Sequence, residues 1–195
     1  MPSEASPTIR LKDCGTISSG QSFRKAPLED HKSQQFIIQT KDLLPEGRIS
    51  QNLTPVSTMG SEKAKPNVDP GDLLILSRGV RFNAGVVEEL PGTSTALNMF
   101  YVFKPKPSEL LPEFIAGYIN NPVTQERLKQ LATGMTIPHL KADDLGSISI
   151  PVPSLEKQRA YVALIEASLE EKRLLEKLSK LRSQQVSAAV GFNLL

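Results

Sequence analysis

Apolar and polar residues alternate in short blocks through most of the first 105 residues, a pattern that predicts β-strands separated by turns. The run Leu73–Leu76 is apolar without interruption, which predicts a strand buried on both faces. In the block 97–105, Phe100 and Val102 would face one side of a sheet, and Tyr101 and Phe103 the other. The predicted strands are 34–40 (QQFIIQT), 71–79 (GDLLILSRG), 84–89 (AGVVEE), 97–105 (LNMFYVFKP) and 147–153 (SISIPVP).

After residue 107 apolar residues recur at every third or fourth position instead of every second one. This spacing predicts two helices, over 108–121 and 121–134. Asn121 is a residue that commonly caps a helix N-terminus, and Pro122 suits the first helical position. Gly134 is the residue type at which the second helix is expected to end, in a left-handed conformation.

The chain from Ser154 to Val190 contains no glycine or proline, which predicts one long helix, capped by Ser154. Apolar residues recur in it at alternating spacings of three and four, interrupted by Glu171 and Gln185. This spacing is typical of a coiled-coil seam, on a rod roughly 54 Å long. One alternative is a helix packed across its own sheet, but the narrow apolar stripe favours a partner helix. The seam is formed by Leu164, Ala167, Leu174, Leu178, Leu181 and Ala188.

These elements predict an α/β (α+β) fold in two parts. Residues 1–153 would form a single globular domain with a mixed sheet, and residues 154–195 a coiled-coil helix that serves dimerisation. The prolines Pro151 and Pro153 would stop the last strand where the helix begins, because each removes a backbone donor.

Composition and charge narrow the class of protein. The 195 residues carry a net charge of +2, too small to indicate nucleic-acid binding alone. The single cysteine, Cys14, permits no internal disulfide, which fits a reducing compartment. No run of about 18 apolar residues is present to cross a membrane, and the N-terminus lacks the basic start and apolar run of a signal peptide. We therefore expect a soluble cytoplasmic protein without membrane contact.

The sequence offers little for catalysis. Its two histidines, His31 and His139, have no second ligand at metal-binding spacing, so no metal is expected. Cys14 has no activating neighbour and is interpreted as a small buried residue. Asp143 and Asp144 are interpreted as acids in the first turn of a helix rather than as metal ligands. No glycine-rich phosphate-binding motif or methyltransferase motif is present, so neither catalytic residues nor a bound cofactor are expected.

Four loops carry side chains suited to reading DNA, because Arg, Lys and Asn contact base edges and Ser and Thr contact phosphates. They span 21–25, 61–65, 77–83 and 133–141. Each loop taken alone is most simply interpreted as a solvated turn. Four such loops in a chain with a protruding helix indicate DNA binding more strongly than any one of them does. The candidate contacts are Arg24, Lys25, Lys63, Lys65, Ser77, Arg78, Arg81, Asn83, Thr136, His139 and Lys141.

Several segments together resemble the specificity subunit of type I restriction–modification systems. IRLKDCGTISSGQSFRK, FIIQTKDLLPEGRIS and VDPGDLLILSRG are similar to successive segments of a target recognition domain in that family. The most specific part is GMTIPHLKADDLGSISIPVPSLEKQRAYVALIE, in which the ISIPVPSLEKQ core resembles the junction between recognition domain and helix. The resemblance covers nearly the whole chain.

The resemblance implies a non-catalytic subunit that reads double-stranded DNA for an adenine methyltransferase and endonuclease complex. Such a subunit has two recognition domains and two antiparallel helices, and each domain reads one half of a split site. Modification subunits bound to the helices would hold S-adenosylmethionine, while ATP and Mg would likewise be bound by partner subunits, which include a restriction and motor subunit.

This chain departs from that pattern because it holds one domain and one helix. It is either a natural half-subunit or a fragment, and a half-subunit would restore the arrangement as a homodimer that reads a split palindrome. The alternative function is a protein–protein adaptor, or regulatory remnant, that occupies the modification subunit without reading DNA. A stand-alone hydrolase or methyltransferase has no motif to support it.

Overall fold

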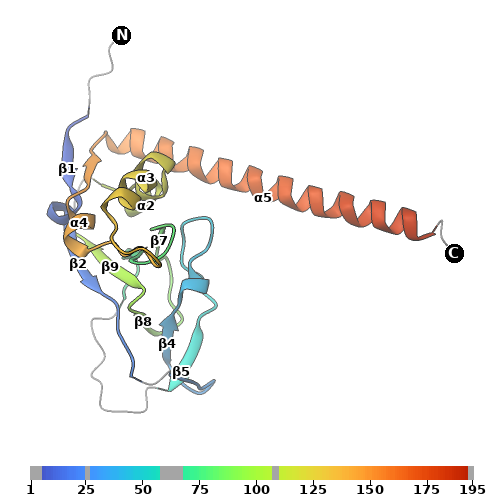
Figure 1. Cartoon of the computed structure of the whole chain (residues 1–195), viewed down its shortest axis with the longest axis horizontal. Helices are drawn as coiled ribbons and strands as arrows, with labels where there is room; N and C mark the ends of the chain where they lie inside the picture. Colours follow the sequence, from blue (N-terminus) through green and yellow to red (C-terminus); the bar gives the residue numbers. More distant parts are fainter. Residues whose placement is uncertain (1–5, 25–26, 58–67, 107–109, 193–195) are drawn as a thin grey trace, which may run out of the picture.

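The computed structural model describes residues 6–24, 27–57, 68–106 and 110–192. A small domain of strands and short helices leads into one long helix that runs away from it (Figure 1). The strands are β1 Thr8–Arg10, β2 Gly15–Ser19, β3 Leu28–Glu29, β4 Gln35–Ile38, β5 Thr54–Ser57, β6 Leu73–Leu76, β7 Ala84–Val86, β8 Thr93–Ala96, β9 Phe100–Pro105 and β10 Ser149–Pro151. The helices are α1 Leu11–Cys14, the 3-10 turn η1 Thr40–Asp42, α2 Pro112–Asn120, α3 Pro122–Leu131, α4 Ala142–Gly146 and α5 Leu155–Phe192.

The described strands form three sheets rather than one. An antiparallel sheet has the order β2-β9-β6-β7, a second sheet has the order β3-β5-β4-β8, and β1 pairs with β10. The second sheet is mixed, since β4 is antiparallel to β5 and parallel to β8. The predicted α+β class with a mixed sheet and a long C-terminal helix is therefore confirmed, although the strands are divided among more sheets than expected.

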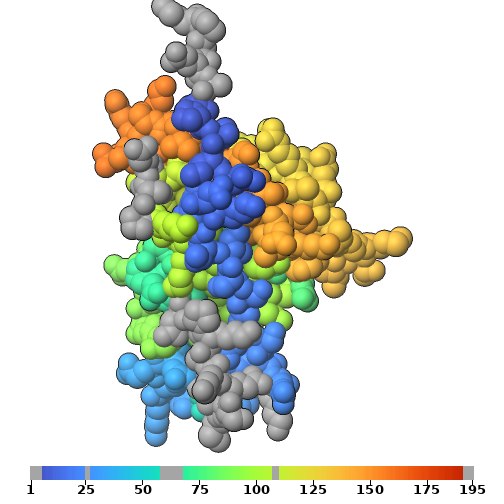
Figure 2. Space-filling model, turned by 90° about the vertical axis from the view of Figure 1, so that its left-hand side faces the viewer, coloured from blue at the N-terminus to red at the C-terminus, as the bar shows by residue number. Residues whose placement is uncertain are grey.

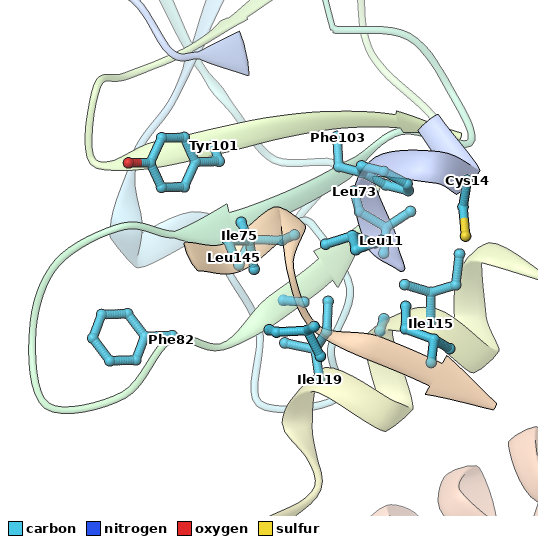
Figure 3. Packing of buried hydrophobic residues seen from close by; sticks show 14 of the residues in the cluster. Leu11, Cys14, Leu73, Ile75, Phe82, Tyr101, Phe103, Ile115, Ile119 and Leu145 are labelled. Atoms are coloured by element: carbon cyan, nitrogen blue, oxygen red, sulfur yellow. The ribbon is translucent and has the colours of Figure 1, made fainter. Parts of the chain in front are cut away.

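The antiparallel sheet is buried on both faces, as the apolar run in β6 predicted. Leu73 and Ile75 of β6 face the short helices, whereas Leu74 faces the mixed sheet. Strand β9 alternates in the same way, with Tyr101 and Phe103 on the helix side. Figure 3 shows the cluster on that side, where Leu11, Leu73 and Phe103 lie close together and Ile115 and Ile119 of α2 lie below them.

Two helix boundaries differ from prediction. Helix α2 begins at Pro112 rather than at 108, and α3 ends at Leu131 rather than at Gly134. Gly134 does have a positive φ of 110°, but Ala132, which follows α3, is already extended. The helix stops early because Thr133 is hydrogen-bonded to His139 instead. The predicted start of α3 is confirmed, since the side chain of Asn121 accepts a hydrogen bond from the Val123 amide at 2.9 Å.

Three strands of the mixed sheet were not predicted, namely β8, β5 and the two-residue β3. Strand β8, Thr93–Ala96, contains no large apolar residue, yet it pairs along its length with β4. Strand β5, Thr54–Ser57, contains Pro55. The strand predicted to begin at 97 begins at Phe100, because Leu97–Met99 form a turn closed by the Phe100 amide and the Leu97 carbonyl at 2.9 Å.

The junction between β10 and α5 is tightly hydrogen-bonded. Strand β10 ends at Pro151, as predicted, and the Val152 amide that follows it donates to the Pro7 carbonyl at 2.8 Å. The Ser154 hydroxyl accepts from the Lys157 amide at 3.4 Å, which is the expected helix cap. Gln158 is fully buried, accepts from the Leu111 amide and donates to the Pro153 carbonyl, both at 2.9 Å.

The first half of α5 packs on α2, and not across a sheet. Tyr161 stacks on Phe114 with ring centroids 6.2 Å apart, and Ile165 lies against Gly117. Arg48, which follows the turn at residues 45–47, forms ion pairs with Glu166 of α5 and with Glu88. Beyond this contact α5 continues past the domain, as Figure 1 shows.

Candidate nucleic-acid interface

The structure connects two of the four predicted loops through the turn Leu97–Met99. On one side of the turn, the Asn98 amide donates to the Gln21 carbonyl and the Asn98 side chain donates to the Ser22 hydroxyl at 2.9 Å. On the other side, the Ser77 amide donates to the Met99 carbonyl at 2.8 Å. The loops 21–24 and 77–83 are thus held by one turn, although they are far apart in the sequence.

The loops 77–83 and 133–141 are joined directly. The Gly79 amide donates to the Pro138 carbonyl, and the Leu140 amide donates to the Ser77 carbonyl, both at 2.9 Å. The backbone of Arg78 also forms an antiparallel bridge with that of His139. These two loops therefore make one composite surface, which carries Arg78, Thr136, His139 and Lys141 of the predicted contacts.

Ser77 does not present its hydroxyl on this surface. Its side chain is buried and donates to the Met99 carbonyl at 3.0 Å, while its own carbonyl accepts from Leu140 and from the His139 ring. The predicted DNA contact is corrected here, because every polar group of Ser77 is used to hold the loops together. The sequence could not predict this, because the residue type of a serine at the end of a strand does not tell whether its side chain faces the solvent or the core.

His139 has a defined tautomer in its neutral form. Its Nδ1 lies 2.9 Å from the Ser77 carbonyl oxygen, which can only accept, so Nδ1 carries the proton. Nε2 is then left as a hydrogen-bond acceptor on a half-buried ring at the surface of the composite loops. This arrangement suits the ring to accept from a base amino group or from a hydroxyl.

Tyr101 anchors the base of the composite loops. Its hydroxyl donates to the Leu140 carbonyl at 2.8 Å, and burial raises the pKa of the phenol, while the positive charge of Arg78 opposes that shift. Asp143 and Asp144 of α4 raise the same pKa, which places both carboxylates near this base. They lie in the first turn of α4, as predicted from the sequence.

Arg81 and Asn83 line a different surface, a cleft between the domain and α5. The segment Phe82–Ala84 is fixed by the buried side chain of Gln125 and the half-buried side chain of Asn120. The Phe82 amide donates to Gln125 at 3.0 Å, and the Ala84 amide donates to Asn120 at 2.8 Å. The structure therefore separates Arg81 and Asn83 from the composite loops that carry Arg78.

The remaining predicted contacts fall elsewhere. Arg24 is exposed at the end of the loop that begins at Gln21. Lys25, Lys63 and Lys65, together with the whole predicted loop 61–65, lie outside the described residues. The structure thus brings together four of the predicted side chains, namely Arg78, Thr136, His139 and Lys141, and whether any of the candidates contacts DNA stays a prediction.

Sequence reasoning missed the residues that position this surface. Tyr101, Asn120 and Gln125 each bridge to backbone atoms more than 30 positions away in the chain, and no local pattern marks such bonds. Only residue type could have indicated these positioning residues, because a polar residue at a buried helical position requires a hydrogen-bond partner. Gln125 in α3 occupies such a position, and Asn120 in α2 is half-buried.

The predicted seam residues of α5 are all exposed in the single chain. Leu164 is 67% exposed, and Leu174, Leu178 and Leu181 are exposed to about half of their surface. The residues that face the domain, which include Val162, Ile165 and Leu169, precede the seam positions by two residues, or about 200° around the helix. The seam is therefore on the side of α5 that points away from the domain.

The described residues show no arrangement suited to catalysis. Cys14 is buried, its thiol donates to the Arg10 carbonyl, and burial and the charge of Asp13 raise its pKa, so the thiolate is disfavoured. Among the described residues, no cluster of three His, Cys, Asp or Glu side chains is placed to hold a metal. Within the same residues, no helix combines the length and the apolarity that a membrane crossing requires.

Solved structures of type I restriction–modification proteins have the same fold. A chain from a study of complex assembly and conformational transition of the type I system is 19% identical with a TM-score of 0.64, and the match covers 91% of this chain and 41% of that one. The HsdS subunit of Thermoanaerobacter tengcongensis is 17% identical with a TM-score of 0.58, covering 91% and 40%. The S subunit of M. genitalium is 20% identical with a TM-score of 0.52, covering 93% and 44%.

The chain spans less than half the length of these structural neighbours. No curated protein sequence matches it. Residues 4–180 match the family model described as the type I restriction modification DNA specificity domain. This family is defined by DNA specificity, which agrees with the expectation of a recognition component rather than a catalytic one. The chain belongs to the family of type I restriction modification DNA specificity domains.

Proposed function

We propose that this chain reads one half of a split DNA site and pairs with a second copy through α5 to read the other half. In this proposal residues 1–153 are the recognition domain and residues 154–195 are the dimerisation helix. The observation that carries the first part is the family match over residues 4–180. The observation that supports the second part is the seam of exposed leucines on α5.

The surface that would meet DNA is formed by the composite loops, with the loop that ends at Arg24 beside it. Arg78 and Lys141 are exposed there and form no ion pair with any described residue, so their charges are available to phosphates or to guanine edges. A single domain with so few cations makes few phosphate contacts, and we therefore expect measurable sequence preference only in the assembled complex.

Two copies would pair in an antiparallel, two-fold arrangement. A two-fold contact uses the same surface on both partners, so the single seam of α5 is sufficient for both. The two domains would then lie at opposite ends of the helix pair, and the site would be a palindrome interrupted by a spacer. The length of α5 and its fixed attachment to α2 would set the spacer.

The partners in this proposal are double-stranded DNA, modification subunits and a restriction and motor subunit, all in the cytoplasm. The chain itself would hold no cofactor, and S-adenosylmethionine, ATP and Mg would be bound by the partner subunits. The target adenine would be flipped into the modification subunit, which would transfer the methyl group. This chain would only position that subunit on the DNA.

DNA reading is tested by co-expressing the chain with a modification subunit and sequencing the DNA for N6-methyladenine. We expect methylation at one interrupted palindrome. Substituting both Arg78 and Lys141 by alanine should abolish methylation while the two proteins still co-purify. If the double variant methylates the same sites at the same level, these two cations do not read DNA, and the adaptor function is favoured.

Self-association is tested separately by light scattering coupled to size-exclusion chromatography. We expect a dimer at micromolar concentrations of the chain. A monomer at all concentrations up to several hundred micromolar, both alone and with the modification subunit, would contradict pairing through α5 and would leave the DNA-reading part of the proposal standing.

A further inference from the structure

The tip of the loop 133–141 exposes apolar side chains rather than polar ones. Met135 is fully exposed and Ile137 is 63% exposed. Val80, on the loop paired with it, is 80% exposed. Figure 2 shows this segment in gold, projecting from the side of the domain as a narrow spur. Exposed apolar residues gathered at a projecting tip indicate a contact surface.

The tip is held in place by its own backbone hydrogen bonds. Thr133 and His139 exchange two of them, at 2.9 and 2.7 Å, so one antiparallel pair closes the loop at its base, and the two chain segments that meet there are called the ribbon. The bond from Gly79 to Pro138 braces the ribbon from the side. A ligand therefore meets a preformed shape, and little ordering of the backbone opposes binding.

The surroundings of the tip favour a polyanion as its ligand. Arg78, His139 and Lys141 lie on the two loops that form the tip, and neither segment 77–83 nor segment 131–141 contains a carboxylate residue. Asp143 and Asp144 begin only where α4 starts, at the base of the ribbon. A modification subunit would be an alternative partner for an apolar tip, but flanking cations without acids match the phosphates on both sides of a DNA groove.

The width of the ribbon selects the groove. The major groove, about 12 Å wide, admits a two-stranded ribbon, whereas the minor groove is only about 6 Å wide. In the major groove of unmodified DNA, the apolar group that a base presents is the 5-methyl group of thymine. We propose that Met135 and Ile137 read a thymine through its methyl group, so that each half-site contains an A·T pair at one fixed position in addition to the pair that holds the methylated adenine. This inference rests on the proposed function and specifies which feature of the DNA the domain reads.

The test uses the complex of the full chain with its modification subunits and the site found by methylation sequencing. Each thymine of a half-site is replaced in turn by deoxyuridine, which removes only the methyl group. We expect binding to weaken about fourfold at one position, as for one buried methyl group, and to be unchanged at the others. Equal binding at every position, or half-sites whose only A·T pair is the methylated one, would overturn the inference.

A variant then assigns the effect to the tip. Met135→Ala with Ile137→Ala should weaken binding to the thymine duplex and remove the difference between thymine and deoxyuridine. Val123→Ala is the matched control, because Val123 on α3 is also 63% exposed; it should preserve both. A tip variant that retains the fourfold discrimination would contradict the assignment.

Two further outcomes separate the tip from the function as a whole. If the tip variant no longer co-purifies with the modification subunit while the wild-type complex ignores the thymine methyl group, the tip is a protein contact and the inference is wrong. In each of these contrary outcomes the wild-type complex still binds DNA sequence-specifically, so the proposed function stands and only the inference about the tip fails. Absence of any sequence preference in the complex would overturn the proposed function and the inference together.

Discussion

The two halves of α5 have a similar apolar period but different surroundings. In the first half, Gln158 is buried against the domain, Tyr161 stacks on Phe114, and Ile165 packs beside Gly117. From Leu174 to Val190 every side chain is exposed, including four leucines. One continuous helix is thus attached to its domain over its first turns and uncovered over the rest.

This difference shows that one helix can carry two apolar stripes, one that packs on its own domain and one that is free for a partner. The stripe that faces the domain and the predicted seam lie on nearly opposite sides of α5, and Leu164 and Ala167 of the seam remain exposed even where the helix is attached. The uncovered seam therefore extends along both halves. We expect changes in the seam to affect assembly alone and changes in the domain-facing stripe to affect the stability of the domain.

The largest effect is expected from charges placed in the distal seam. Leu174→Asp with Leu178→Asp removes two side chains whose burial contributes about 1.5–3 kcal/mol each. We expect self-association to weaken at least about a hundredfold, measured by sedimentation equilibrium, with no change in the urea unfolding of the domain. Ser179→Asp with Ser183→Asp on the other side of α5 is the control. Equal weakening by both pairs would place the contact on another face.

The next effect concerns the buried glutamine at the base of α5. Gln158→Leu leaves the Leu111 amide and the Pro153 carbonyl without their side-chain partner, and a buried polar group without a partner costs about 1–3 kcal/mol. We expect the free energy of unfolding, measured in urea, to fall by about 3 kcal/mol. Gln184→Leu in the exposed half should change it by less than about 0.5 kcal/mol. A similar loss of stability in both variants would mean that the two halves of α5 do not differ in their contribution to the stability of the domain.

A smaller effect is expected where α2 and α5 approach closely. A Cβ atom on Gly117 would lie 2.6 Å from Cδ1 of Ile165, so Gly117→Val forces the two helices apart. A double-mutant cycle with Ile165→Ala should give a coupling free energy of about 1 kcal/mol, because the smaller side chain makes room. The same cycle with Leu169→Ala should give none. Independent effects of Gly117→Val and Ile165→Ala would show that this contact does not hold the helices together.

The smallest effect is expected from the ion pairs that join the domain to α5. Arg48 lies 3.0 Å from Glu88 and also pairs with Glu166, but all three side chains are 39–50% exposed to solvent. Arg48→Met should lower the free energy of unfolding by about 0.5 kcal/mol, and 1 M salt should remove the difference. Arg182→Met in the distal half should have no effect. A loss above about 2 kcal/mol would show that Arg48 is essential for the attachment of α5.

Local patterns in the sequence predicted the parts of the fold that depend on local chemistry. The apolar run of β6, the cap at Asn121 and the cap at Ser154 are each determined by a few neighbouring residues, and all three predictions are confirmed. Strand β8 was missed because its residues are small, and its pairing with β4 is decided by the rest of the fold. The seam of α5 could be predicted as a pattern, but the face that packs on α2 could not.

The candidate interface was predictable only as separate loops. Nothing near Arg78 in the sequence indicates that its backbone pairs with His139, because 61 positions separate them and the contact forms only when both loops are folded. The same limitation explains the error at Ser77, whose hydroxyl is directed inward by the turn at Met99. Residue type identified side chains able to contact DNA, and the tertiary hydrogen bonds decide which of them share one surface.

The pairing of β1 with β10 has a consequence for how genes of this family can grow. It places the start of the described chain beside the base of α5, as Figure 1 shows. In an antiparallel pair of the kind proposed, the far end of one α5 would lie near the base of the other, and therefore near the first strand of that copy. A tandem duplication with a short connecting segment would then produce a single chain with two domains and no change in the packing of either. The structural neighbours, of which this chain covers 40–44%, have the length that such a duplication would give.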